Sequence, residues 1–326
     1  MNFKNRIFKI SSISEFKEIA LEVFNHQYEN IDVYHRYVDL CYRTKPIFDT
    51  IEKIPFLPIN FFKSQKIIAN NTKEDCVFGS SGTSGARQSL HYVKDLSIYE
   101  KCFIKGFNLF YGEISEYCIL ALLPSYIERK DSSLIYMVQK LIDISQCDES
   151  KFYLNNQDEL YHKLKFLRKK KQKTILIGVS FALLDFVEKY QCDFPELIVM
   201  ETGGMKGKRK EMVREEMHTI LKKRFGVNSI HSEYGMTELL SQAYSKGNGI
   251  FYCPPWMKVL ARDPNDPGSN ISENRKGCLN IIDLANFNSC SFIATDDYGN
   301  VNADSSFNVL GRIDNSDIRG CNLMIE

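Results

Sequence analysis

The sequence of 326 residues lacks several features that would place it in a specialised class. No stretch approaches the roughly 20 apolar residues of a membrane-spanning helix, and the N-terminal segment has no apolar run long enough for a secretion signal. Lys plus Arg number 42 and Asp plus Glu number 41, so neither sign of charge dominates. This balance argues against nucleic acid or an anionic membrane as the main partner. The absences together predict a cytoplasmic protein.

Metal-binding and disulfide patterns are also missing. The chain has ten cysteines, yet none form a C-x-x-C pair and none stand near histidines at metal-ligand spacing. Without a secretion signal, most of these cysteines are expected to be small buried residues. We therefore expect neither a structural zinc site nor a disulfide framework.

Hydrophobic patterning predicts an α/β protein with three regions and no internal repeat. Residues 1–70 predict helices followed by an extended segment, with Ser12 and Glu15 resembling a capping box. Residues 71–246 alternate between strand-like and helix-like runs, which predicts layered α/β sheets with right-handed crossovers. Residues 247–326 are richer in Pro, Gly, Asn and Asp and carry short β-like runs, which predicts a small β-rich subdomain.

Individual elements follow from the same patterns. Strands are expected at 76–78, 87–93, 117–123, 174–177, 197–200, 228–232, 277–282, 291–295 and 306–309. Helices are expected at 31–42, from Asp95 onward, and at 133–144, 157–171, 181–190 and 207–224.

The first segment with chemical potential directly follows the strand expected at 76–78. Three glycines allow close approach of the backbone to an anion, and four hydroxyl side chains add donors. It is not a Walker A loop, because no Lys-Ser/Thr follows the last glycine, and no Gly-x-Ser-x-Gly nucleophile elbow can be drawn through it. A polar flexible turn is the alternative. The candidate phosphate-binding residues are Ser80, Ser81, Gly82, Thr83, Ser84 and Gly85.

A second segment lies at residues 231–238. A turn containing Gly235, with the Thr237 hydroxyl and the Glu238 carboxylate, suits a phosphate and its Mg²⁺, a hard cation that usually takes one or two carboxylates. Read alone, Glu238 equally suits a solvated acid at a helix start. His231 is a candidate base for a nucleophile, or a structural hydrogen-bonding histidine.

Two further segments are weaker signals. Residues 295–299 (TDDYG) read naturally as a β-turn. Residues 311–314 (GRID) and 317–321 (DIRGC) can be a surface salt-bridge cluster, with Cys321 merely packing. The remaining histidines singled out, His91, His162 and His218, are expected to be surface or packing residues.

In their order and spacing, these segments resemble the adenylate-forming superfamily of acyl-CoA synthetases, adenylation domains and luciferases. The matching motifs are the hydroxyl loop at 80–85, Tyr-Gly-x-Thr-Glu at 234–238, Thr-x-Asp at 295–297 and Gly-Arg-x-Asp at 311–314. Residues 122–125 (LLPS) are similar to the superfamily's strand-end proline segment near the acyl pocket. Residues 201–204 (ETGG) are similar to its glycine-rich turn beside adenine.

Within the superfamily, the chain resembles in particular the acyl-protein synthetases, the fatty-acid-activating component of bacterial luminescence fatty acid reductase. Phenylacetate-CoA ligases share the same core motifs. The resemblance rests on residues 54–58 (IPFLP) with 61–64 (FFKS), and on the terminal segment 319–324 (RGCNLM). It implies the superfamily's large domain, with layered α/β sheets and a small β-rich subdomain.

The resemblance also implies a reaction and its cofactors. ATP and Mg²⁺ would activate a carboxylic acid, expected to be fatty, to an acyl-adenylate, and a protein cysteine would then receive the acyl group. An acyl-acceptor, or a reductase or acyl-donor protein, is the implied partner. The implied catalytic residues are Cys321, Thr237, Glu238 and His231, with Glu238 as metal ligand. The implied nucleotide-binding residues are the 80–85 loop, Gly203, Gly204, Tyr234, Gly235, Asp297 and Arg312.

Two departures from the superfamily pattern affect these expectations. Ordinary members continue beyond Gly-Arg-x-Asp as a mobile domain with a catalytic lysine, whereas only twelve residues follow Asp314 here, so that domain is expected to be absent. Asp296 stands where the superfamily usually has Gly, which leaves two candidate ribose acids, of which Asp297 fits the motif. The alternative functions are an adenylating acyltransferase with another biosynthetic acceptor, and a catalytically silent nucleotide- or acyl-binding module.

Overall fold

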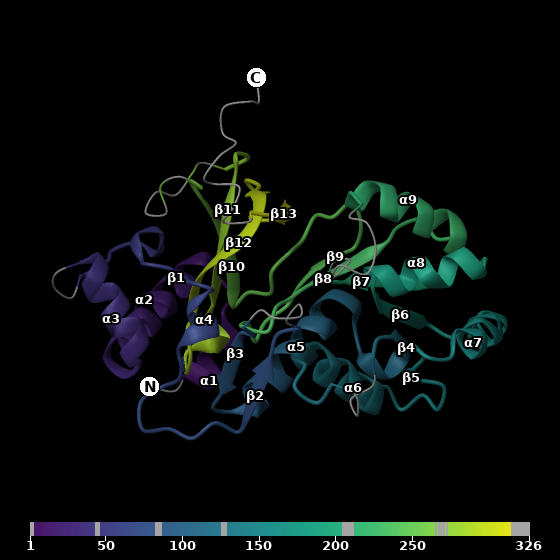
Figure 1. Cartoon of the computed structure of the whole chain (residues 1–326), viewed down its shortest axis with the longest axis horizontal. Helices are drawn as coiled ribbons and strands as arrows, with labels where there is room; N and C mark the ends of the chain where they lie inside the picture. Colours follow the sequence, from purple (N-terminus) through teal and green to yellow (C-terminus); the bar gives the residue numbers. More distant parts are fainter. Residues whose placement is uncertain are drawn as a thin grey trace.

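The computed structural model describes residues 3–42, 46–81, 87–124, 129–203, 212–264, 266, 271 and 273–313. Two main sheets, each accompanied by helices, lie side by side, and the last described strand, β13, extends toward α9 of the other half (Figure 1). This architecture confirms the expected α/β class with layered sheets.

The larger sheet has the strand order β5-β4-β6-β7-β8-β9, with all neighbours parallel except β8 and β9. Its strands are β4 (Cys118–Leu122), β5 (Lys151–Phe152), β6 (Thr174–Val179), β7 (Ile198–Thr202), β8 (His231–Tyr234) and β9 (Ala243–Ser245). Every residue of β4 and β6 is buried, as their unbroken apolar runs predict for strands covered on both faces.

Most helices that accompany this sheet agree with the sequence patterns, but the helix expected at 207–224 begins only at Arg214, since residues 212 and 213 are not helical. The helices are α5 (Leu96–Tyr111), α6 (Ser133–Ser145), α7 (Gln157–Lys170), α8 (Ser180–Lys189) and α9 (Arg214–Phe225), with the 3₁₀ turn η3 (Ile114–Glu116). Side chains cap several of them: Asp95 accepts from the Ser97 amide at the start of α5, and Ser132 accepts from the Ile135 amide at the start of α6.

The smaller sheet contains β1 (Leu57–Pro58), β10 (Met257–Arg262), β11 (Lys276–Asp283), β12 (Phe292–Val301) and β13 (Phe307–Arg312). The 3₁₀ turn η4 (Leu284–Asn286) directly follows β11 in the chain. Residues 295–299 lie inside β12, so their interpretation as a β-turn was wrong. Their turn-prone composition yields to pairing on both sides, with β11 and β13. Two register shifts remain in this stretch, one against β13 between Tyr298 and Gly299, and one against β11 where Leu279 lies opposite residues 295–297.

The N-terminal helices pack beside the smaller sheet. They are α1 (Phe3–Arg6), η1 (Ile7–Lys9), α2 (Ile13–Asn30) and α3 (Asp32–Cys41), followed by η2 (Ile51–Lys53) and α4 (Phe61–Ser64). Ser12 caps α2 as expected, but the Glu15 carboxylate returns to the amide of Ser11. β1 pairs with β12, and the buried Gln27 amide donates to the Asn286 carbonyl. The three-region division stays a prediction.

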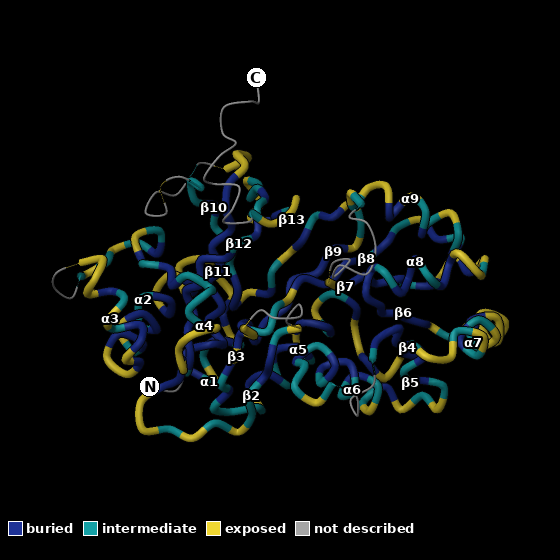
Figure 2. Tube along the Cα trace, in the orientation of Figure 1, coloured by how far each residue is buried: buried dark blue, intermediate teal, exposed yellow. Residues whose placement is uncertain are grey.

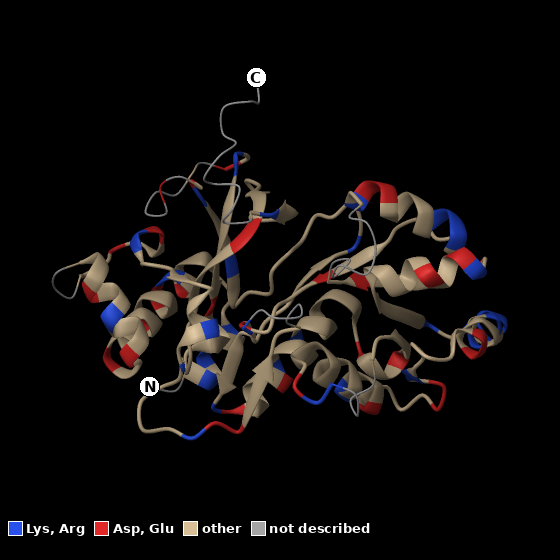
Figure 3. Cartoon of the chain, viewed as in Figure 1, with Lys and Arg blue, Asp and Glu red and all other residues tan. Residues whose placement is uncertain are grey.

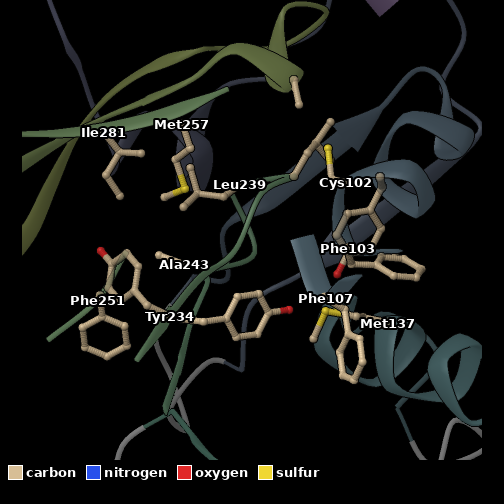
Figure 4. Close-up of a cluster of buried hydrophobic side chains, with 14 of the residues drawn as sticks. Cys102, Phe103, Phe107, Met137, Tyr234, Leu239, Ala243, Phe251, Met257 and Ile281 are labelled. Atoms are coloured by element: carbon tan, nitrogen blue, oxygen red, sulfur yellow. The ribbon is translucent and has the colours of Figure 1, made fainter. Parts of the chain in front are cut away.

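A separate two-stranded hairpin, β2 (Cys76–Gly79) and β3 (Leu90–Val93), carries the hydroxyl loop. Between the two main sheets runs the 235–242 segment, which is neither helix nor strand. Residues 238–242 of this segment are buried, and the dark tube in Figure 2 marks the buried residues around the junction. In Figure 4, Leu239 and Ala243 lie between Met257 and Ile281 of the smaller sheet and Phe103 of α5. One hydrophobic core therefore spans both sheets.

Charged residues of both signs occur along the helices (Figure 3). In α7 and α9 the acidic residues lie in the first turn and basic residues in the last. None of the helices in the described ranges combines the length and apolar character needed to cross a bilayer. Over the same ranges, no group of three or more His, Cys, Asp and Glu side chains could by itself hold a metal ion.

Candidate active site

Two hydrogen bonds between Ser80 and Ser89 join the chain segments on either side of the hydroxyl loop. The amide of Ser80 donates to the carbonyl of Ser89 at 3.0 Å, and the amide of Ser89 donates to Oγ of Ser80 at 2.9 Å. Ser81 is exposed beyond this base. Four loop residues predicted to hold phosphate, Gly82, Thr83, Ser84 and Gly85, lie outside the described residues. The described residues beside the loop, Ser80 and Ser89, therefore extend the β2–β3 hairpin by one bonded pair.

Glu238 is a buried carboxylate in the 235–242 segment, only 5% exposed. This position excludes the interpretation as a solvated acid at a helix start. Burial raises its pKa, while a hydrogen bond from Ser89 and the positive charges of Arg312 and Lys63 act in the opposite direction. A buried carboxylate whose charge is only partly compensated is suited to a cation. Thr237 precedes it and is partly exposed.

Asp297, Tyr234 and Arg312 meet through hydrogen bonds. The Tyr234 hydroxyl donates to one Asp297 oxygen at 2.7 Å, and Nε of Arg312 donates to the other at 3.0 Å. Register explains the second contact, because Asp297 of β12 lies directly opposite Arg312 of β13. Asp297 is buried, whereas the Arg312 side chain is 71% exposed. The Asp297 carboxylate therefore lies at the edge of the junction between the two main sheets, beside the exposed side chain of Arg312.

The Tyr234 ring is enclosed by aromatic neighbours. Phe251 and Phe307 pack edge-on against it, with centroids 5.8 and 5.3 Å away. Burial raises the pKa of its hydroxyl, which stays a donor to Asp297. At Gly235, a Cβ would lie 2.5 Å from a Glu233 carboxylate oxygen, so a larger residue here would have to displace the Glu233 side chain.

The glycine-rich turn follows β7. Gly203 has φ of +64°, a left-handed conformation that favours glycine, and its carbonyl accepts a hydrogen bond from Ser180 at 2.7 Å. Gly204 lies outside the described residues. The neighbouring Glu201 is buried beside Arg214 of α9, whose Nε is 3.3 Å away, and beside His218. Arg214 also donates to the Val309 carbonyl of β13 at 3.1 Å, which ties this turn to the smaller sheet.

His231 is not brought into this cluster. It stands at the start of β8 beside Met200, three residues before Tyr234, and its Nδ1 lies 3.2 Å from the Tyr111 hydroxyl. Burial lowers the pKa of His231 to about 4, so the ring is neutral at neutral pH and accepts the Tyr111 proton. These contacts match the structural alternative better than the catalytic one. Cys321 lies outside the described residues.

Acidification is expected to lower stability partly through His231. Its folded pKa of about 4 lies below the ordinary value of 6.5, so between these values the unfolded chain binds more protons. The free energy of unfolding contributed by this group therefore falls as the pH falls. His231→Gln keeps an acceptor for Tyr111 but does not titrate, and should lose about 2 kcal/mol less stability than the wild type between pH 7 and pH 5. Urea denaturation measures this, and equal losses would contradict it.

Several site residues gave no usable signal in the sequence. Ser89 and Lys63 act on Glu238, and His91 and Asn286 contact the backbone around it. His91 and His218, expected as surface or packing residues, are both buried. A single polar residue in a short strand carries no periodicity, so only the folded arrangement reveals these partners.

An apolar cavity lies behind the junction, inside the larger sheet's half. Its wall combines side chains of α5, α6 and five strands of the larger sheet, β4, β6, β7, β8 and β9. The lining residues are Phe107, Ile119, Met137, Leu141, Ile175, Ile177, Met200, Tyr244 and Glu233. Glu233, the one charged group among them, accepts a hydrogen bond from the Thr202 hydroxyl at 2.5 Å. Glu233 directly precedes Tyr234 in β8.

Comparisons with known proteins agree with this geometry. A family described as "Acyl-protein synthetase, LuxE" matches residues 11–326. No curated protein sequence matches significantly.

Two solved structures show the breadth of the structural likeness. MatB from Rhodopseudomonas palustris, described as ATP bound, is 15% identical with a TM-score of 0.54, over 72% of this chain and 47% of its own. A 2-hydroxyisobutyryl-CoA ligase, in complex with 2-HIB-AMP and CoA, is 11% identical with a TM-score of 0.67, over 93% of this chain and 70% of its own. The chain spans about half the length of the MatB structures it matches. At these identities the likeness is one of fold.

Proposed function

This chain belongs to the acyl-protein synthetase (LuxE) family, and on that premise we propose that it converts a carboxylic acid and ATP to an acyl-adenylate and pyrophosphate, and then passes the acyl group to a protein cysteine. The observation that carries the proposal is the linkage of four motif segments. The hydroxyl loop's base reaches Glu238 through Ser89. The positive charge of Arg312 lowers the pKa of the same carboxylate, and Arg312 pairs with Asp297, which in turn accepts from Tyr234.

ATP would lie along this line of residues. Asp297 would accept the ribose hydroxyls, displacing one of its present donors, and Arg312 is exposed enough to turn toward a phosphate. Tyr234 and the Gly203–Gly204 turn would enclose adenine, Thr237 would contact the α-phosphate, and the 80–85 loop would hold the outer phosphates. The fold likeness to MatB, whose structure is described as ATP bound, supports this nucleotide.

Adenylation needs little covalent chemistry from the protein. A carboxylate oxygen of the acid attacks the α-phosphorus, a new P–O bond forms, and pyrophosphate leaves with the electrons of the broken P–O bond. The protein would hold the acid and the phosphate in line and surround the transferring group with fixed donors. Phosphoryl-type transfers depend mainly on such positioning and charge stabilisation.

Mg²⁺ suits Glu238, because this cation usually takes one or two carboxylates and completes its shell with phosphate oxygens and water. The buried, partly compensated Glu238 charge fits that donor set. Mg²⁺ would neutralise phosphate charge when bound. The Ser89 hydroxyl would keep the Glu238 carboxylate oriented.

The apolar cavity supports an acid with a hydrocarbon chain. Eight of its nine lining residues are apolar or aromatic, and two are methionines, which adapt to flexible ligands. We assign the acyl group to this apolar lining, with its carboxylate toward the Tyr234–Glu238 turn. The space now present, about 10 Å³, holds no more than about one water molecule, so the acyl chain would enter by displacing flexible side chains such as the two methionines. A fatty acid fits this lining better than a charged or sugar-like acid.

The acceptor is proposed to be Cys321. Its thiolate would attack the acyl carbon, forming a thioester and releasing AMP as the C–O bond breaks. A thiolate is a good nucleophile when a nearby cation lowers its pKa, and Arg319 stands two residues away.

Intact-mass spectrometry tests both steps. Incubation with ATP, Mg²⁺ and a panel of acids should add one acyl mass to the wild type. Cys321→Ser should lose at least about nine-tenths of that label while keeping acid-dependent ATP–pyrophosphate exchange. Cys41→Ser is the matched control, because Cys41 is exposed and so provides an accessible thiol elsewhere on the surface.

The outcomes separate the alternatives. Undiminished labelling of Cys321→Ser would exclude the cysteine relay and favour an adenylating acyltransferase with another acceptor. Absence of exchange with every acid would favour a silent binding module.

A further inference from the structure

His91 is a fully buried residue of β3, with 0% of its surface exposed. Its Nδ1 is 2.8 Å from the carbonyl oxygen of Thr237, and its Nε2 is 3.0 Å from Oδ1 of Asn286. Phe62 of α4 packs edge-on against the imidazole, with centroids 5.8 Å apart. The ring is therefore held in place with each nitrogen beside an oxygen atom. Burial lowers the pKa of His91 to about 4, so the ring is neutral and its single N–H donates to one of these two oxygens.

Asn286, at the end of η4, is held just as tightly. Its Nδ2 donates at 2.8 Å to the carbonyl of Glu238 and at 2.8 Å to the carbonyl of Cys290. These two acceptors determine which end of the amide is nitrogen, and so Oδ1 faces His91. Asn286 is 1% exposed, so water does not replace these partners readily.

His91 and Asn286 together contact two consecutive carbonyls, those of Thr237 and Glu238. The 235–242 segment that contains them is neither helix nor strand, so no regular ladder supplies donors to these carbonyls. A buried carbonyl without a donor is costly, which makes a specific side-chain partner decisive for the segment's path. Asp283 supports the same segment further on, accepting from the amides of Leu240 and Ser241.

The pair also connects this turn to the hydroxyl loop. His91 lies in β3, and Ser89 directly precedes this strand of the β2–β3 hairpin. Ser89 bonds the Glu238 side chain, while His91 and Asn286 hold the backbone at Thr237 and Glu238. One hairpin thus sets both the phosphate loop's base and the orientation of the carboxylate.

We propose that His91 and Asn286 form a positioning pair that holds Thr237 and Glu238 in the geometry needed to bind the phosphates of ATP with Mg²⁺; this rests on the proposed function. Neither side chain has to touch the substrate. Their effect passes through the two backbone carbonyls they contact.

Three variants separate positioning from general stability. His91→Leu fills the space but removes both nitrogens. His91→Gln restores N–H donors, since a carboxamide carries two of them. Asn286→Ala removes the donors to Glu238 and Cys290. Ser150→Ala is the control, because Ser150 is also a buried polar residue and its Oγ accepts a hydrogen bond from the Ile119 amide of β4 at 2.8 Å.

Calorimetry of ATP binding with and without Mg²⁺ is the first readout. The wild type should gain affinity when Mg²⁺ is added, and His91→Leu and Asn286→Ala should lose about 10- to 100-fold of that gain, the usual effect of removing a group that orients a metal ligand. His91→Gln should recover most of it, and Ser150→Ala should retain it. The double variant should lose no more than the larger single loss, because both residues act through one turn.

Acid-dependent ATP–pyrophosphate exchange and thermal melting are measured on the same proteins. The positioning role predicts a fall in kcat that exceeds any change in KM for ATP and does not follow the melting temperature. Two results would overturn the inference. One is that Mg²⁺ increases the ATP affinity of His91→Leu as much as that of the wild type; the other is that His91→Leu, His91→Gln and Ser150→Ala lose this increase equally. If the wild type exchanges with no acid, the proposed reaction fails, while the binding measurement still decides the positioning role.

Discussion

Glu238→Gln is expected to reduce acid-dependent ATP–pyrophosphate exchange by about 100- to 1,000-fold, the range typical for loss of one preorganised charge-stabilising group. Glutamine keeps the shape and can still accept from Ser89, so the change removes mainly the negative charge. Without that charge, Mg²⁺ loses its one proposed protein carboxylate.

The same substitution should not destabilise the fold. Burial raises the pKa of Glu238, which means that ionisation is unfavourable in the folded protein. Removing the charge is therefore expected to leave the melting temperature unchanged or to raise it, a common relation between activity and stability at functional sites.

A matched control is Glu149→Gln, which removes a carboxylate paired with Lys163 next to β5. Exchange should stay at the wild-type rate. Retention of exchange in Glu238→Gln, or a loss explained by unfolding in thermal melts, would contradict the assignment.

Asp297→Asn is expected to weaken ATP binding by about 100-fold. A hydrogen bond to a charged acceptor contributes about 1.5–3 kcal/mol, and asparagine retains one acceptor oxygen while losing the charge. Stability should fall by less than about 1 kcal/mol, because the Arg312 partner is 71% exposed and its ion pair is screened by solvent.

Two controls sharpen this result. Asp296→Asn tests the other candidate ribose acid; successive side chains of β12 point to opposite faces, and Asp296 should retain wild-type affinity. A nucleotide that lacks both ribose hydroxyls should bind weakly to the wild type and equally weakly to Asp297→Asn. A variant that still prefers ATP over this analogue would exclude Asp297 as the ribose acceptor.

Local patterning predicted much of the larger sheet. The apolar run at 117–123 predicted β4, and the strand expected at 174–177 is β6, because strands covered on both faces need continuous apolar sequence. The expected helices at 133–144 and 157–171 match α6 and α7 within a residue. The strand expected at 228–232 lies further along the chain in the structure, as β8, which ends at Tyr234, the first residue of the Tyr-Gly-x-Thr-Glu motif.

Patterning failed where pairing partners are distant. TDDYG has the composition of a turn, yet two neighbouring strands draw it into β12 and bring Asp297 opposite Arg312. His91 had no periodic signal, because its role depends on Thr237, 146 residues away, and on Asn286, 195 residues away. Such contacts arise only when separate elements pack.

The sequence by itself determined the α/β class, most elements of the larger sheet, and the motifs with which the chain joins the acyl-protein synthetase family. These properties depend on residue type and on spacing within short windows, which the sequence states directly. Only the tertiary structure decided that Tyr234, Asp297 and Arg312 form one hydrogen-bonded group, that Glu238 is buried, and that His91 and Asn286 hold its backbone. The physical reason is that burial and hydrogen bonding are properties of neighbours in space, and these neighbours come from both sheets and a hairpin.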